Sequence, residues 1–320
     1  MKKTVKNILS LVLSLSFMGL TGCKEKENLT KVKMACNPFV GMAPFYVAMD
    51  KGYFKAEGID FEKVDFDDSS NSCSALVSGS VDFAYVTMDS AIITASQSEK
   101  PALKVFSVVD ESYGADGILA KNDITSIADF KGKNVGVSIS QTSHYLLLKA
   151  LKTVGLSDED MNLINMTASD AGVAFMTGNL DVAVTWEPYL SNAVSTGAGK
   201  MIFSSIDAPG AIVDVMIISP ENVSAQWLPA VKKAYDKGLA FIRDSATKAE
   251  AVKITAKYLE TDEAEAEDMI DTVKLYTFDE ASAALKKGAV AYNAVNDISD
   301  FYCSKKIISE MIKPEDIIAE

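Results

Sequence analysis

Two stretches of the chain, residues 76–84 (LVSGSVDFA) and residues 175–183 (FMTGNLDVA), repeat one pattern. In each copy a run with helical character reaches a glycine, a short turn follows, and an aspartate precedes an apolar run typical of a buried strand. A chain that builds the same helix-turn-strand unit twice is expected to form two lobes of similar construction.

Short apolar runs alternate with helical stretches through most of the chain, which predicts an α/β fold. The strand-like runs are residues 32–35, 59–64, 82–86, 103–109, 135–137, 163–165 and 182–185. Helical stretches end at Gly52, Gly155 and Gly178, and the chain from residue 224 onward is predicted to be mostly helical without a strand. A chain of 320 residues with 48% hydrophobic content can bury a sizeable core.

Polar residues follow the strand in each copy of the repeat. Thr87 and Asp89 follow the first copy, and Trp186 and Glu187 follow the second. Ligands favour such strand ends in α/β proteins, so these residues predict a binding site between the lobes.

The N-terminus has the features of an export signal. Lys2, Lys3 and Lys6 precede an apolar run over residues 8–20, which is too short to span a membrane and ends in LTGC at Cys23. This ending resembles a bacterial lipobox, so we expect residues 1–22 to be a lipoprotein signal peptide, Cys23 to carry the lipid, and residues 23–30 to form a hydrophilic tether. The alternative is an ordinary signal peptide with a chance cysteine.

The remaining composition argues against several classes of function. Cys36, Cys73 and Cys303 are widely spaced, which indicates neither a disulfide framework nor a zinc cluster, although one bridge stays open. The only histidine, His144, has no second histidine for a metal site or a Ser-His-Asp relay. A net charge of −13 argues against a nucleic-acid partner. We therefore expect no metal, no cofactor and no catalytic residue.

Residues 48–60, AMDKGYFKAEGID, resemble the periplasmic binding proteins for taurine, alkanesulfonates, nitrate and thiamine-pyrimidine precursors. The resemblance continues through residues 75–82, 127–133, 143–156 and 186–189 and so covers nearly all of the mature chain. It implies the type II periplasmic-binding-protein fold, with two α/β lobes that each contain a mainly parallel sheet flanked by helices.

The resemblance also implies how the chain is divided. Lobe one is expected to comprise residues 31–116 and 214–320, with helices at the C-terminus, and lobe two residues 117–213. The two strands that cross between the lobes are expected near residues 115–121 and 211–219. Two lobes that close on one ligand remove it from water on both sides, and a permease can then recognise the closed form.

Residues 138–144 lie between a predicted strand and a predicted helix, where free backbone N–H groups favour an anion. Thr142, Ser143 and His144 are therefore candidate ligand-binding residues, with simple helix capping as the alternative. The resemblance places a sulfonate- or phosphate-facing turn at this position. Asn37 and Phe45 are candidates for a wall of the cleft and Ser70 for a cleft-facing turn, the alternatives being core packing and capping.

Acidic residues are predicted at the strand ends and crossings, and bases are scarce there. Asp116, Glu187 and Asp214 would suit an ammonium group or an aromatic amine, and Trp186 could add a cation–π contact. The alternative for each acid is a solvated loop charge. Simple inorganic anions such as nitrate are not expected, since their sites usually recruit Arg or Lys.

These patterns together favour an extracytoplasmic solute-binding lipoprotein of an ABC importer. It is expected to be a monomer on the cell membrane, facing the periplasm or the exterior, and to deliver a small organic solute to a permease and its ATPase. The candidate solutes are taurine-like or alkanesulfonate-like compounds and pyrimidine- or riboflavin-like vitamin precursors. One alternative is an enzyme on the same fold that makes the thiamine pyrimidine from its own histidine and pyridoxal phosphate, and the single His144 argues against it. The other is a sensory lipoprotein.

Overall fold

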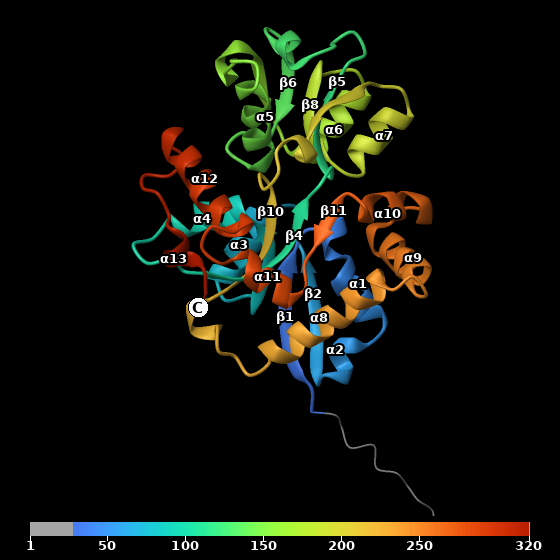
Figure 1. Cartoon of the computed structure of the whole chain (residues 1–320), viewed down its shortest axis with the longest axis vertical. Helices are drawn as coiled ribbons and strands as arrows, with labels where there is room; N and C mark the ends of the chain where they lie inside the picture. Colours follow the sequence, from blue (N-terminus) through green and yellow to red (C-terminus); the bar gives the residue numbers. More distant parts are fainter. Residues whose placement is uncertain (1–27, 320) are drawn as a thin grey trace, which may run out of the picture.

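The chain forms two α/β lobes, each built around its own β-sheet, in a computed structural model that describes residues 28–319 (Figure 1). The six-stranded sheet has the order β11 (Val273–Leu275), β4 (Lys104–Ser112), β10 (Val213–Ile218), β3 (Phe83–Thr87), β1 (Thr30–Cys36), β2 (Ile59–Asp65). The five-stranded sheet has the order β7 (Asn162–Asn165), β6 (Asn134–Val137), β8 (Val182–Trp186), β5 (Asp116–Ala120), β9 (Lys200–Ser204). The predicted fold class is confirmed.

The direction of the strands follows from the way the chain passes between the lobes. In the six-stranded sheet β1 pairs in parallel with β2 and β3, and in the other sheet β6 pairs in parallel with β7 and β8. Strands β10 and β5 each enter a sheet from the other lobe, and both run antiparallel to their neighbours. The sheets are therefore mixed, where the sequence predicted mainly parallel ones, because the entering strand starts at the edge where the parallel strands end.

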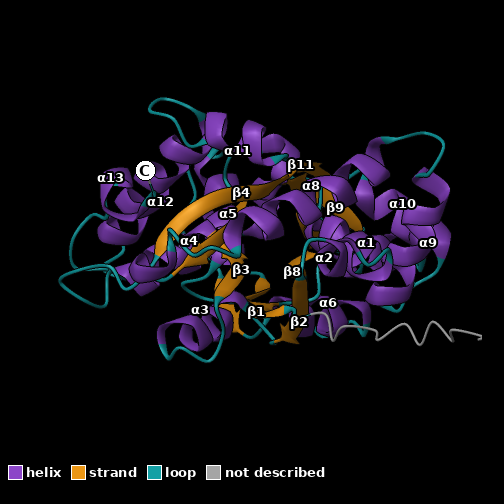
Figure 2. Ribbon diagram, turned by 90° about the horizontal axis from the view of Figure 1, so that it is seen from below, coloured by secondary structure: helices purple, strands orange, loops and turns teal. Residues whose placement is uncertain are grey.

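The helices cover both sheets (Figure 2). The six-stranded lobe carries α1 (Ala43–Asp50), α2 (Tyr53–Ala56), α3 (Ser69–Val77), α4 (Met88–Ala95), α8 (Leu228–Arg243), α9 (Lys248–Leu259), α10 (Glu263–Ile270), α11 (Phe278–Ala284), α12 (Val290–Ser304) and α13 (Pro314–Ile317). The five-stranded lobe carries α5 (Thr142–Lys152), α6 (Ala168–Met176) and α7 (Tyr189–Ser195). Single 3₁₀ turns lie at Val40–Met42, Ile127–Phe130, Asp158–Asp160, Ser205–Asp207 and Pro220–Asn222.

The repeat seen in the sequence forms equivalent units in the two lobes. Helix α3 leads into β3 and α6 leads into β8, and the glycines after the helices, Gly79 and Gly178, have positive φ angles of 73° and 82°. Asp82 Oδ2 accepts a hydrogen bond from the backbone N–H of Lys33 at 2.7 Å. Asp181 Oδ2 accepts one from Asn134 at 3.1 Å. Each aspartate therefore joins its strand to the neighbouring parallel strand.

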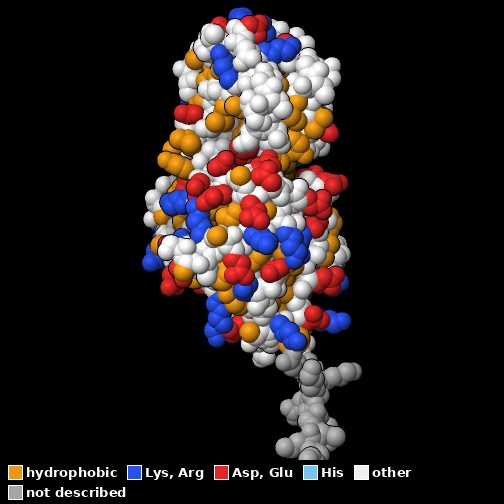
Figure 3. Space-filling view, turned by 90° about the vertical axis from the view of Figure 1, so that its right-hand side faces the viewer, with side chains coloured by type: hydrophobic (Ala, Val, Ile, Leu, Met, Phe, Trp, Pro, Cys, Tyr) orange, Lys and Arg blue, Asp and Glu red, His pale blue; other side chains and the backbone are white. Residues whose placement is uncertain are grey.

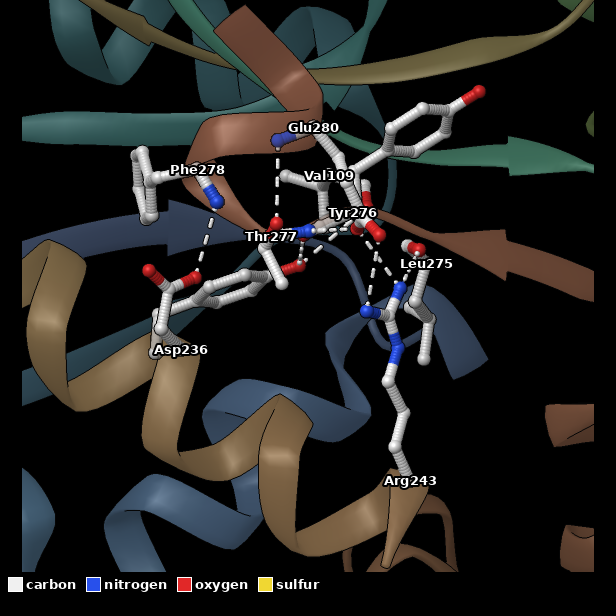
Figure 4. Close-up of polar contacts among 9 residues, drawn as sticks. Val109, Asp236, Arg243, Leu275, Tyr276, Thr277, Phe278 and Glu280 are labelled. Carbon is white, nitrogen blue, oxygen red and sulfur yellow. Dashed lines mark hydrogen bonds and ion pairs between the residues drawn. The ribbon is translucent and has the colours of Figure 1, made fainter.

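The helical C-terminal region is attached to the edge of the six-stranded sheet by polar contacts (Figure 4). Arg243 at the end of α8 donates to Glu280 Oε2 at 2.9 Å and to the Leu275 carbonyl at 2.8 Å. The hydrogen bond from Arg243 lowers the pKa of Glu280 to about 2. Leu275 ends β11, a strand that pairs antiparallel with β4 in a region where the sequence predicted no strand. That prediction was wrong because β11 has only three residues.

The N-terminal predictions lie outside the described residues, since the signal peptide and Cys23 precede residue 28. Within residues 28–319, no helix is both long enough and apolar enough to cross a membrane. Cys36, Cys73 and Cys303 are free thiols, so the bridge that the sequence left open is not formed among these three.

Candidate ligand-binding site

A cavity of about 180 Å³ lies between the two sheets. It is lined by residues at or just after the ends of parallel strands of both lobes, among them Asn37, Thr87, Ser138 and Trp186. Two acids near the start of the entering strands, Asp116 of β5 and Asp214 of β10, complete this part of the lining. The cavity thus lies at the strand ends where the sequence placed a site.

Hydroxyl groups from both lobes dominate the polar lining. The six-stranded lobe contributes Ser69, Ser70, Thr87 and Ser90. The five-stranded lobe contributes Ser138, Thr142, Ser143, Thr167 and Ser169. A hydroxyl group both donates and accepts hydrogen bonds, so this lining suits a polar solute.

Helix α5 begins at the cavity wall without a side-chain cap. Its N-cap residue, Gln141, makes no capping hydrogen bond, and Gln141, Thr142 and Ser143 all line the cavity. The first N–H groups of a helix have no partner within the helix, and the helix dipole makes this end positive. The start of α5 is therefore suited to an anionic group.

Two hydrogen bonds hold the turn before α5 in place. Ser143 Oγ accepts from the Ser138 backbone N–H at 3.2 Å, and Ser140, whose φ is 67°, donates from its N–H to His144 Nδ1 at 3.2 Å. The Thr142 hydroxyl donates to Asp89 Oδ1 of α4 at 2.7 Å. Because α4 and α5 belong to different lobes, this last bond also joins the lobes beside the cavity.

The acidic side of the cavity continues into a buried network. Tyr85 Oη lies 2.6 Å from Asp214 Oδ2 and 3.1 Å from Asp110 Oδ2. A tyrosine hydroxyl has one hydrogen to donate, so simultaneous bonds to both carboxyl groups require one of them to be protonated. Burial raises the pKa of Asp110 to about 7, and burial with the nearby Asp110 raises that of Asp214 well above its usual value. At neutral pH this network therefore holds a proton.

Eight of the twelve ligand-binding candidates named from the sequence line this cavity: Asn37, Ser70, Thr87, Asp116, Thr142, Ser143, Trp186 and Asp214. The other four, Phe45, Asp89, His144 and Glu187, do not. Phe45 is fully buried in the core, where its ring packs against Phe54, Phe61 and Tyr235. Phe45 therefore packs in the core, which was the alternative to a cleft-wall role.

Each of the three remaining residues makes at least one hydrogen bond to a residue outside the lining. Glu187 accepts from the Ser191 N–H at 3.0 Å and the Ser191 hydroxyl at 2.8 Å, at the start of α7. Asp89 accepts from Tyr302 Oη at 2.9 Å as well as from Thr142. Burial lowers the pKa of His144, which favours its neutral form.

The sequence reasoning missed lining residues at the start of α6, among them Thr167 and Ser169. The internal repeat contained the necessary signal. The alignment that pairs Leu76 with Phe175 also pairs Ser70 with Ser169, and it pairs the N-cap of α3, Asp68, with that of α6, Thr167. No group of three or more His, Cys, Asp or Glu side chains within residues 28–319 is arranged to hold a metal ion.

Two α/β lobes with a polar cavity at the facing strand ends define a binding protein of the two-lobed periplasmic type. The family model described as NMT1/THI5 like matches residues 40–249, and the chain belongs to this family. The resemblance seen in the sequence is thereby confirmed.

Individual proteins show the same likeness. A putative binding protein of Brucella abortus is 26% identical over 317 residues, covering 96% of this chain and 95% of the relative. The taurine-binding periplasmic protein of Escherichia coli is 25% identical over 189 residues, covering 59% of this chain and 58% of the relative. The crystal structure of the periplasmic aliphatic sulphonate binding protein SsuA from E. coli matches with a TM-score of 0.76 at 19% identity, covering 91% of this chain and 92% of that one.

Proposed function

We propose that this protein is the solute-binding lipoprotein of an ABC importer and that it captures a small organic sulfonate. The observation that carries the proposal is the uncapped start of α5 at the wall of a small hydroxyl-lined cavity. Such a helix start provides N–H donors and positive potential for a sulfonate group. Relatives named for taurine and aliphatic sulfonates support this choice.

The size of the cavity separates the candidate solutes. A protein cavity of about 150 Å³ accommodates a molecule as large as benzene, whereas sites for drug-sized ligands usually exceed about 300 Å³. A cavity of about 180 Å³ therefore favours a compact sulfonate over a riboflavin-like heterocycle.

Capture by lobe closure is part of the same proposal. Lobe one would comprise residues 31–116 and 214–320, lobe two residues 117–213, and the lobes would move about the β4–β5 and β9–β10 connections. Two polar contacts between the lobes support a closing surface. Thr142 of α5 bonds to Asp89 of α4, and Lys305 pairs with Asp158 at 2.9 Å.

A binding role is favoured over an enzymatic one. The enzymatic alternative would consume a histidine of the protein itself. His144, the single histidine of the chain, is 4% exposed and lies outside the cavity lining. Its Nδ1 accepts from Ser140 and its Nε2 lies 3.4 Å from Asp158 Oδ2. A sensory lipoprotein would use the same closure, and transport of the solute by cells with and without the protein would distinguish the two roles.

Membrane attachment through Cys23 leads to a first prediction. Cys23→Ser is expected to move the protein from the membrane fraction to the soluble fraction, because serine offers no thiol for the lipid, and to leave solute affinity unchanged. Fractionation of expressing bacteria followed by immunoblotting measures this, with Cys303→Ser as the control that should remain in the membrane. An unchanged membrane fraction for Cys23→Ser would remove the lipid anchor from the proposal.

The start of α5 leads to a second prediction, in which a backbone group is tested separately from a side chain. Thr142→Pro removes the first N–H of the helix, and proline is well tolerated at this first helical position after an extended residue such as Gln141. We expect sulfonate affinity to fall by about 2 kcal/mol, the cost of losing one hydrogen bond to a charged group. Thr142→Ala keeps the N–H and should lose less.

Isothermal titration calorimetry with ethanesulfonate compares these two variants with the unmodified protein. Thermal unfolding checks that both variants fold. Equal affinity for Thr142→Pro and Thr142→Ala would mean that the backbone of α5 does not bind the sulfonate.

A further inference from the structure

The charged residues of the cavity all have the same sign. Asp67, Asp68, Asp116 and Asp214 belong to the lining, and none of the lining residues in the described part of the chain is Lys or Arg. Asp67 is exposed, whereas Asp116 and Asp214 are 8% and 4% exposed. Figure 3 shows that acidic side chains also gather on the surface near the level where the two lobes meet. A purely anionic solute would meet no countercharge among these lining side chains.

Asp214 has hydrogen-bonding capacity that the protein does not use. Its Oδ2 accepts from Tyr85, while its Oδ1 is buried and has no hydrogen-bond partner. Asp110 Oδ1, on the neighbouring strand β4 where Asp110 is paired with Asp214, is also buried without a partner. Buried carboxylate oxygens without partners are costly, so a donor is expected to reach this position in the functional state.

Asp116 and Asp214 lie on strands of different lobes. Asp116 begins β5 of the five-stranded sheet, where it is paired with Trp186 of β8. Asp214 lies in β10 of the six-stranded sheet, where it is paired with Thr87 of β3. All four residues line the cavity. A single cationic group between the two carboxylates would therefore contact both lobes, and the Trp186 indole could add a cation–π interaction.

We propose that Asp116 and Asp214 form a subsite for a protonated amino group, so that the solute is a zwitterionic amino-sulfonate. The inference rests on the sulfonate function proposed above and specifies its substrate class. An ammonium group has three donors for the two carboxylates, and its charge offsets the acidic lining. The sulfonate end would meet α5, and the amino end would make closure of the two lobes depend on the ligand.

Ammonium binding at this subsite would displace protons. The charged and titratable groups that act on Asp110, Asp116 and Asp214 from the surrounding strands and helices are acids and phenols, namely Asp89, Glu111, Glu187, Tyr85 and Tyr235, and the Ser112 hydroxyl also hydrogen-bonds to Asp116. Burial raises the pKa of Asp116 to about 7, as it does for Asp110. A cation beside these carboxyl groups lowers their pKa again, so binding at neutral pH should release protons and tighten as the pH rises from about 6 to 8.

The test compares two sulfonates that differ only at the far end. Taurine carries an ammonium group where 2-hydroxyethanesulfonate carries a hydroxyl. In calorimetric titrations at pH 7 we expect taurine to bind at least about tenfold more tightly, as a charge-assisted contact would require. Titrations in two buffers with different ionisation heats should show proton release for taurine and none for the hydroxyl analogue.

Variants identify the residues responsible. Asp116→Asn and Asp214→Asn should each reduce the preference for taurine, while Glu221→Gln, an exposed acid outside the lining, should keep it. If an Asn variant fails to fold, the comparison of the two sulfonates on the unmodified protein still tests the ammonium subsite. Equal affinity for both compounds, or taurine binding without proton release, would overturn the ammonium subsite and leave sulfonate binding intact. Failure of taurine, 2-hydroxyethanesulfonate and ethanesulfonate alike to bind would overturn the sulfonate function, and this inference with it.

Discussion

Gly238→Ala is expected to destabilise the protein by about 3 kcal/mol, although alanine is the better helix former by about 1 kcal/mol. Gly238 lies inside α8, where that helix packs on α1. A Cβ atom at this position would lie 2.0 Å from the carbonyl oxygen of Pro44 and 3.3 Å from the backbone nitrogen of Ala48. Because these are backbone atoms of α1, the clash can be relieved only if the two helices separate.

Urea denaturation measures this effect, and a matched control on the same helix isolates propensity from packing. Ala240 is exposed on α8, so Ala240→Gly should cost only about 1 kcal/mol through helix propensity. The sign of the Gly238→Ala effect is the decisive observation. A Gly238→Ala protein more stable than the unmodified one would mean that helix propensity alone sets the effect. That result would contradict the close approach of α1 and α8.

Gly238 also illustrates which part of the fold could be predicted from the sequence. The periodicity after Leu228 predicted a long helix, and the structure has α8 over Leu228–Arg243. Periodicity does not reveal which helix packs there or why a glycine is tolerated inside it, since both depend on a contact with α1. Strand β11 escaped prediction for a related reason. It has three residues, and pairing with β4 rather than a local pattern makes it a strand.

The named residues that line the cavity are mostly those whose place is fixed by a strand end or a crossing between the lobes. Trp186 was chosen because it follows a predicted strand, and parallel strands bring such ends to one edge of a sheet. Asp116 and Asp214 were chosen because they lie at the predicted crossings between the lobes. The structure places Glu187 outside the lining, because here the direction of one side chain matters. Glu187 directly follows Trp186, yet it binds Ser191 at the start of α7. Neighbouring positions can thus face different partners, and the sequence alone does not distinguish them.

The stability of the ligand-free protein is expected to fall by several kcal/mol as the pH rises from about 5 to 8. Asp110 and Asp116 both have a pKa raised by burial from 3.8 to about 7, so the folded chain holds protons that the unfolded chain has already released. Stability from such groups is fully present below the unfolded pKa and is lost as the pH rises through the folded pKa. A shift of this size corresponds to roughly 4 kcal/mol for one independent carboxyl group.

Groups with the opposite sign mostly act below this window, and His144 opposes the decline within it. Glu280, whose pKa the Arg243 contact lowers to about 2, loses its contribution only at acid pH, below the window. His144 has a lowered pKa, so its contribution to stability increases as the pH rises toward its unfolded pKa, and His144→Gln should make the decline steeper.

Urea midpoints at pH 5, 6, 7 and 8 measure how steeply stability declines with pH. Asp110→Asn should flatten this decline by removing one of the titrating carboxyl groups. Stability that stayed level or rose between pH 5 and 8 would mean that the Tyr85, Asp110 and Asp214 network is ionised in the folded protein. The proton released on amine binding would then have no source there.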